Sequence, residues 1–361
     1  MFDLNFKIIG LFIVLIYFSF GQTSKLKYST NGELSFGINL INYAEENSNS
    51  HQSFFYYYPK LNISKKLNKE IFVDFEYSLF LSKVHKEYNK YDDFLNVRKS
   101  NHSLWLRFNS KNKEIRIGLQ KIIFGPSHIL RSLAWFDNYD FTNPFIKMGG
   151  VNSIRFRNFF SNFSYFTSWI IFKQLNQLSY GIRYNYSFDT MDCAFTFHRQ
   201  SENKENNILQ TYLAIKYPHN KYAFDLRYDG YVGLWLESVL LGFKNKILPY
   251  GTIGIDYTFN VLDGIYVLTE TMITDVKNKQ VYSAFLLSKQ ISYIHNISFT
   301  SQIDWNNKMI LNYFQWDMNF DSYALKYSFA LIPNNFTLIN HKKTYFSNFE
   351  IDHKIIISFN Y

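Results

Sequence analysis

Alternation of apolar and polar residues with a period of two is the feature of this sequence that most restricts its fold. The clearest alternating segments are 115–120, 222–229, 252–259, 323–331 and 355–361. In residues 222–229, for example, the aromatic or aliphatic residues 222, 224, 226 and 228 share one face. The charged residues 225, 227 and 229 lie on the other. This pattern predicts β-strands with one apolar face. After Gln22 no apolar stretch is long enough for a transmembrane helix, and no run keeps a helical spacing.

Composition favours strands that contact lipid over a pair of soluble domains. The chain has 38 Phe and 29 Tyr but only 6 Pro and 15 Gly. Phe and Tyr favour strands, and aromatic side chains are enriched where a membrane meets water. The single cysteine, Cys193, excludes an intramolecular disulfide framework and zinc clusters of the Cys type. The formal charge of +9 fits an anionic partner or Lys-rich surface loops.

The first residues have the layout of a secretory signal peptide. Lys7 precedes an apolar run over residues 8–18, and small residues follow before the polar Gln22. The run is too short to cross a bilayer, which takes roughly 20 helical residues. We therefore predict a signal peptide over 1–21, cleaved before Gln22, with a single N-terminal anchor helix as the alternative. No cysteine follows Gly21, which argues against a lipoprotein anchor.

Residues 22–361 are predicted to form one antiparallel transmembrane β-barrel. At roughly 19 residues per strand with its turn, about 18 strands fit, with 16 as the other even number. Expected membrane strands have about 9 to 11 residues. A barrel is required because lipid satisfies no backbone N–H or C=O group, so the sheet must close on itself. The last strand ends on Phe359 and Tyr361, an aromatic ending typical of barrels that the outer-membrane assembly machinery inserts.

The segment 125–150 is much longer than the short polar turns around it. Its many apolar side chains predict packing inside the barrel as a constriction, with an external lid as the alternative. Polar and aromatic residues of this loop are the candidates for contact with a solute. They are Arg131, Trp135, Asp137 and Asp140.

Part of the sequence resembles a known group of proteins. The strand Arg-Ile-Gly-Leu-Gln at 116–120 leads into Phe-Gly-Pro at 124–126, Ile-Leu-Arg at 129–131 and Trp-Phe-Asp at 135–137. This stretch resembles porin-like outer-membrane barrels related to the alginate-export family. Residues 140–144 keep only the first Asp and last Pro of that group's Asp-Pro-Arg-Asp-Pro pattern. The resemblance covers about 116–150 and implies a passive or substrate-selective channel for small solutes or acidic sugars.

If the apolar strand faces meet lipid, the opposite faces line the lumen. The predicted lumenal side chains are Arg107, Arg116, Gln120, Arg155, Arg157, Arg183, Lys216, Arg227 and Lys326. Arginine binds carboxylate and phosphate through two parallel hydrogen bonds, so this lining favours anions. The alternative is that the arginines pair with lumenal acids such as Asp225, Asp256 or Glu270 and stiffen the wall. A register slip by one residue would turn them outward.

We therefore expect a channel for small anionic or sugar solutes in the outer membrane of a Gram-negative-type bacterium, in contact with its lipid. The alternative is a barrel without a channel that binds surface polysaccharide or an assembly partner, and association into oligomers is left open. His102, His128, His198 and His295 have no nucleophile elbow near them, so no enzymatic activity is expected, with an outer-membrane hydrolase that uses Ser, His and an acid as the remaining alternative. No metal-ligand spacing, phosphate loop or dinucleotide fingerprint predicts a cofactor, and no nucleic-acid partner is expected.

Overall fold

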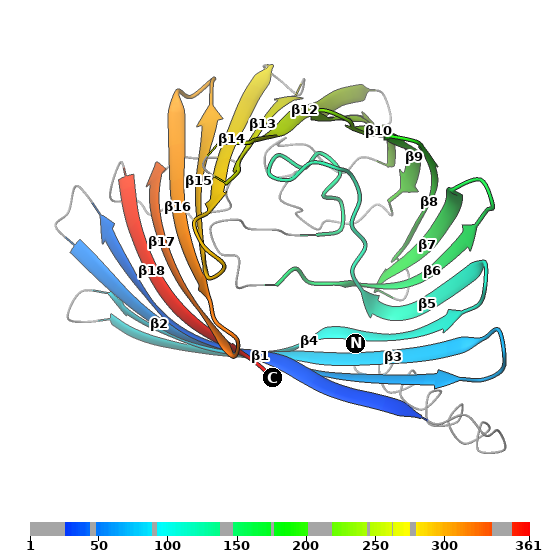
Figure 1. The fold of residues 1–361 in the computed structure, drawn as a ribbon, viewed down its shortest axis with the longest axis horizontal. Helices are drawn as coiled ribbons and strands as arrows, with labels where there is room; N and C mark the ends of the chain where they lie inside the picture. Colours follow the sequence, from blue (N-terminus) through cyan, green and yellow to red (C-terminus); the bar gives the residue numbers. More distant parts are fainter. Residues whose placement is uncertain are drawn as a thin grey trace.

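The computed structural model describes ten stretches of the chain. They are residues 26–43, 48–88, 92–137, 147–174, 177–200, 219–243, 246–261, 263–274, 279–333 and 349–361. The predicted signal peptide, Lys216 and Asp140 lie outside these residues. Within them the chain forms one closed antiparallel sheet of 18 strands, which confirms the predicted barrel and its strand number (Figure 1). Among the described residues no helix is both long and apolar enough to cross a bilayer.

The strands follow one another around the barrel in sequence order. They are β1 (Lys27–Tyr43), β2 (Ser48–Lys66), β3 (Phe72–Tyr88), β4 (Asp92–Asn109), β5 (Lys113–Gln120), β6 (Val151–Phe159), β7 (Ser164–Gln174), β8 (Gln177–Phe188), β9 (Met191–Arg199), β10 (Asn220–Asp229), β11 (Gly233–Gly242), β12 (Ile247–Phe259), β13 (Ile265–Thr274), β14 (Gln280–Gln290), β15 (His295–Asp304), β16 (Met309–Asn319), β17 (Tyr323–Pro333) and β18 (Phe349–Asn360).

The barrel closes where β1 pairs with β18. Gly37 lies opposite Ile356 in this pairing, and the hydroxyls of Ser35 and Ser358 are 2.9 Å apart on its inner side. Closure pairs the backbone groups that an open sheet would leave exposed at its two edges.

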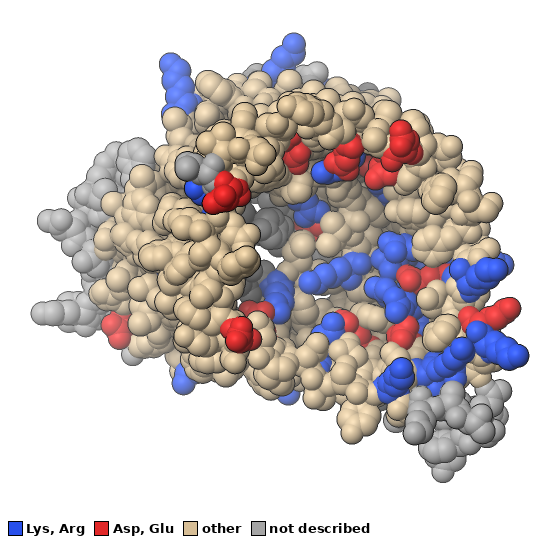
Figure 2. All heavy atoms as spheres, viewed as in Figure 1, with Lys and Arg blue, Asp and Glu red and all other residues tan. Residues whose placement is uncertain are grey.

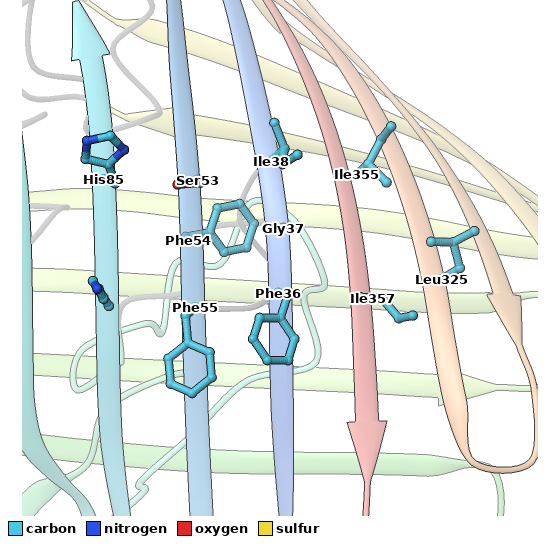
Figure 3. A pocket seen from close by; sticks show the side chains of 11 residues that line it. Phe36, Gly37, Ile38, Ser53, Phe54, Phe55, His85, Leu325, Ile355 and Ile357 are labelled. Carbon is cyan, nitrogen blue, oxygen red and sulfur yellow. The ribbon is translucent and has the colours of Figure 1, made fainter. Parts of the chain in front are cut away.

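The two faces of the wall follow the predicted alternation. Along β11 the side chains alternate strictly between buried and exposed, with Leu236 outside and Glu237 inside. Ile182 on β8 and Ile253 on β12 remain 46% and 60% exposed on the outer face. A shallow apolar groove of about 590 Å³ crosses this outer face, where Phe55, Phe36 and Ile357 lie side by side on β2, β1 and β18 (Figure 3). An outer surface of this kind fits contact with hydrocarbon.

The barrel has a turn end and a loop end. The turn end holds the start of β1, the end of β18 and short turns such as residues 110–112 between β4 and β5. At the loop end β5, β9 and β17 end, and β6, β10 and β18 begin. The polar residues Asn220 and Lys221 belong to β10, since both pair with β9 and β11.

The first four strands are much longer than predicted. β1 to β4 have 17 to 19 residues, whereas the other strands have 8 to 13. β4 pairs with β5 only over residues 104–109, so residues 92–103 project beyond β5 toward the loop end. The expectation of 9 to 11 residues is wrong for these strands because their hairpins keep pairing with one another past the rest of the wall.

Candidate functional site

The connection after β5 turns into the barrel and packs against one side of the lumen. Its buried side chains Ile122, Phe124, Leu133 and Trp135 form one apolar cluster with wall residues of β7, β10, β11 and β12. Figure 1 shows this segment inside the ring of strands. The prediction that the loop 125–150 folds into the lumen is confirmed for residues 125–137, whereas residues 138–146 lie outside the described part of the chain. We call residues 121–137 the lumenal loop. Its partner wall runs from β7 to β14.

Two buried carboxylates fix the backbone of the lumenal loop. Glu270 on β13 accepts hydrogen bonds from the backbone N–H groups of His128, Ile129 and Leu130 at 2.6, 2.9 and 2.6 Å. The indole N–H of Trp235 donates to the same carboxylate at 3.2 Å. One wall side chain therefore satisfies three consecutive amides that packing has removed from water.

Glu237 on β11 holds the two ends of the same turn. Its carboxylate accepts the N–H of Ser127 at 2.9 Å and the N–H of Leu133 at 3.1 Å. Sequence reasoning missed Glu237 and treated Glu270 only as a charge that offsets arginine. The available signal was an acid at an inward position of an otherwise apolar strand, since such a residue needs a buried partner.

Gly125 gives the lumenal loop its tight entry, and its replacement by alanine tests this. Its φ is +81°, and an added Cβ would clash with Oε1 of Glu237. We expect Gly125→Ala to lower the free energy of unfolding by about 1–3 kcal/mol, because it strains the backbone and displaces the carboxylate. Urea unfolding monitored by tryptophan fluorescence measures this. Gly149→Ala is the matched control, since nothing lies within 4 Å of its added Cβ. Equal effects of the two changes on stability would contradict the role of Gly125 in the tight entry of the loop.

The predicted loop residues differ in their surroundings. Arg131 and Asp137 form an ion pair at 2.9 Å, and burial raises the pKa of Asp137 against the pull of the arginine. The indole N–H of Trp135 donates to the hydroxyl of Tyr250 at 3.3 Å, so Trp135 anchors the loop to β12. These three side chains therefore support the docked loop, and their contact with a solute stays a prediction.

Across the lumen, three arginines lie side by side on adjacent strands. Arg107, Arg116 and Arg155 are directly opposite one another in the pairing of β4, β5 and β6. They share the carboxylate of Glu114, at 3.7, 3.8 and 3.0 Å. Asp74 also binds Arg107, at 2.8 Å. Like charges at facing positions repel one another. We call these three residues the arginine row, and it makes the wall less stable than neutral residues would.

Three of the other predicted lumenal cations form ion pairs with carboxylates on the wall. Arg183 makes a two-pronged bond to Asp225 at 2.7 and 2.8 Å, and Arg227 binds Asp229 at 2.8 Å. Lys326 lies 3.8 Å from Asp317. The geometry of these three residues fits the alternative expectation that lumenal cations pair with acids and stiffen the wall.

Arg157 differs, because within the described stretches it has no carboxylate partner and its buried Nε has no hydrogen bond. Gln120, also predicted to line the pore, is buried, and its amide donates to the carbonyls of Arg116 and Ser153. Gln120 therefore braces the junction of β5 and β6.

Two cavities along the described wall include arginines that were predicted to line the lumen. The larger, about 720 Å³, lies against β1 to β5 and includes Arg116, and we call it the β1–β5 chamber. The smaller, about 280 Å³, lies under residues 123–126 and includes Arg157, Arg183 and Arg227. Figure 2 shows Lys and Arg side chains gathered inside the opening of the barrel. The described lumen thus combines an apolar, loop-covered side with a basic side.

Comparison with known proteins gives a likeness of fold. No protein-family model matches the chain, and no curated protein matches it. An engineered variant of the porin of Rh. blastica aligns with a TM-score of 0.51 at 10% identity, over 93% of this chain and 100% of that one. A second variant aligns with a TM-score of 0.50 at 11% identity over the same shares. An anion-selective porin from Comamonas acidovorans aligns with a TM-score of 0.49 at 10% identity. This similarity is too low to indicate the selectivity of the present chain. The chain therefore has the fold of a porin, built as a closed antiparallel barrel of 18 strands.

Proposed function

We propose that this chain is an outer-membrane channel for small anionic solutes, narrowed by the lumenal loop. The observation that carries the proposal is the arginine row on β4 to β6, which stands across the lumen from the docked loop. Rings or rows of arginine attract anions in a pore because the guanidinium charge is permanent and its donors match oxyanions. The unfavourable approach of three like charges is then explained by a role in transport.

The outer face of the barrel supports the proposed location of the channel. Exposed aliphatic side chains such as Ile182 and Ile253 suit lipid, and we propose the outer membrane of a Gram-negative-type bacterium as its location. Insertion by the barrel-assembly machinery would precede function, and association of several copies is compatible with the proposal. A relation to the alginate-export family, with acidic sugars as solutes, rests on the resemblance at 116–150.

The test is the reversal potential of refolded protein in a planar bilayer under a salt gradient. We expect an anion preference that falls by about twofold or more in Arg116→Ala, since a nearby unit charge contributes on the order of 1 kcal/mol in water. Arg155→Ala should act in the same direction. Lys289→Ala removes a cation from the outer side of β14 and should leave the preference unchanged. A pore that prefers cations, or is insensitive to Arg116, would contradict the proposal.

The second candidate is a barrel without an open channel that binds a surface polysaccharide or an assembly partner. It is favoured by the amount of lumen that the loop fills, since Leu133 and Trp135 are buried against the wall. Electrical silence from correctly folded, heat-modifiable protein would support this candidate over the channel.

A further inference from the structure

The β1–β5 chamber has the composition of a site for a doubly charged anion. We propose that it binds a small dianion, a phosphate monoester or a dicarboxylate, through Arg116 and Lys121. This inference rests on the proposed channel function and names the class of solute for it. The chamber is lined by β1 to β5, by Lys121 and Lys147, and by Asn360 and Tyr361.

The side chains that line the chamber carry more positive than negative charge. Four are cationic and two are carboxylates: Lys60, Arg116, Lys121 and Lys147 against Glu33 and Glu76. Both carboxylates are already engaged. Lys60 lies 2.6 Å from Glu76, and Lys147 lies 2.7 Å from Glu33. The cations left over are Arg116 and Lys121.

Arg116 is held in place but only weakly neutralised. Its guanidinium lies 4.3 Å from the ring centre of Trp105, which fixes its position by a cation–π contact. Its nearest carboxylate, Glu114, is 3.8 Å away and lies closer to Arg155, at 3.0 Å. A guanidinium that is fixed in position and shares its nearest carboxylate with another arginine is prepared for an oxyanion.

Lys121 is the second cation, and it lies in a positively charged neighbourhood. No ion pair involves it within the described part of the chain. Its side chain is exposed, but partial desolvation lowers the pKa of the ammonium, and the charges of Lys147 and Lys60 lower it further. An anion bound beside Lys121 would relieve this repulsion. The flexible, point-like ammonium complements the planar fork of Arg116.

The charge count and the neutral lining select the class of ligand. A surplus of two side-chain charges is balanced better by a dianion than by chloride or acetate, and a phosphate monoester carries close to two negative charges at neutral pH. Tyr58, Ser78 and Tyr361 also line this space and add polar, uncharged groups to it. The volume of about 720 Å³ is in the range of small-molecule sites.

Isothermal titration calorimetry of the full-length barrel in detergent tests the site without a bilayer. The probes are glycerol phosphate and succinate as dianions, acetate as a monoanion and glycerol as a neutral control. We expect one dianion to bind at least about tenfold more tightly than acetate, with no heat from glycerol. Preference for glycerol phosphate identifies a phosphate ligand, and preference for succinate identifies a dicarboxylate.

Variants separate the site from general charge effects. Lys121→Gln lies outside the strands, so the barrel should fold, and we expect it to weaken dianion binding about tenfold. Arg116→Gln should weaken it by a similar factor, whereas Lys289→Gln on the outer face should not. Equal binding of acetate and the dianions, or undiminished binding by Lys121→Gln, would overturn the site. A conducting, anion-preferring pore without dianion binding would refute only this inference, and dianion binding by a silent barrel would refute only the channel.

Discussion

Replacing Glu270 by alanine is expected to release the lumenal loop and raise the single-channel conductance several-fold. The backbone N–H groups of residues 128–130 would lose their shared acceptor in a buried position. Each unsatisfied donor costs about 1–3 kcal/mol, so docking should weaken by about 3 kcal/mol or more. The loop regains hydrogen bonds to water only by leaving the wall, and leaving widens the lumen.

Two measurements check the release of the loop. Single-channel recording reports the conductance, and limited trypsin digestion reports exposure of the loop, because Arg131 becomes accessible when the loop leaves the wall. Glu237→Ala should also raise the conductance and the cleavage by trypsin, since Glu237 binds Ser127 and Leu133. Asp317→Ala is the matched control, because it removes a lumenal carboxylate that binds Lys326 and Gln315. Unchanged conductance and unchanged digestion in Glu270→Ala would contradict the role of this carboxylate.

The second large effect concerns the outer face. Ile182 lies near the middle of β8 and is 46% exposed. We expect Ile182→Lys to destabilise the barrel in lipid vesicles by about 2–4 kcal/mol, the cost of a cation on the lipid face near the midplane of a bilayer. Urea titration with tryptophan fluorescence measures the difference.

Ser187→Lys provides the control for that substitution on the same strand. Ser187 faces the smaller lumenal cavity, where water can solvate an added charge, so little change is expected. Equal destabilisation by both lysines would show that the outer face of β8 does not contact lipid.

The arrangement of the wall could be read from sequence because its signal is local. Alternation tells which side chains share a face, and hydrophobicity tells which face meets lipid. Arg116 and Arg155 were therefore assigned to the lumen without any knowledge of their neighbours. The register that brings Arg116 opposite Arg155 was not predictable. It depends on the length of the connection between β5 and β6. The approach of both to Glu114 emerges only in the folded barrel.

The loop contacts were beyond sequence reasoning for a related reason. Glu237 binds Ser127 across 110 positions, and Glu270 binds His128 across 142. Nothing near Ser127 indicates which wall it reaches. The extra length of β4 was missed because residues 92–103 are mostly polar and do not alternate. Their strand conformation comes from pairing with β3, whose own pattern is interrupted by an irregularity between Ser78 and Leu79.

The order of the strands has a consequence for the folding kinetics. Seventeen of the pairings around the barrel join consecutive strands, but the seam between β1 and β18 joins residues such as Ser35 and Ser358, 323 positions apart. Hairpins can form early at small entropic cost, whereas the seam requires closure of nearly the whole chain, and that cost rises with the logarithm of its length. Until the seam forms, β1 and β18 are free edges that can pair with another chain. We therefore expect closure of this seam to limit the rate of refolding, and the yield to fall as protein concentration rises.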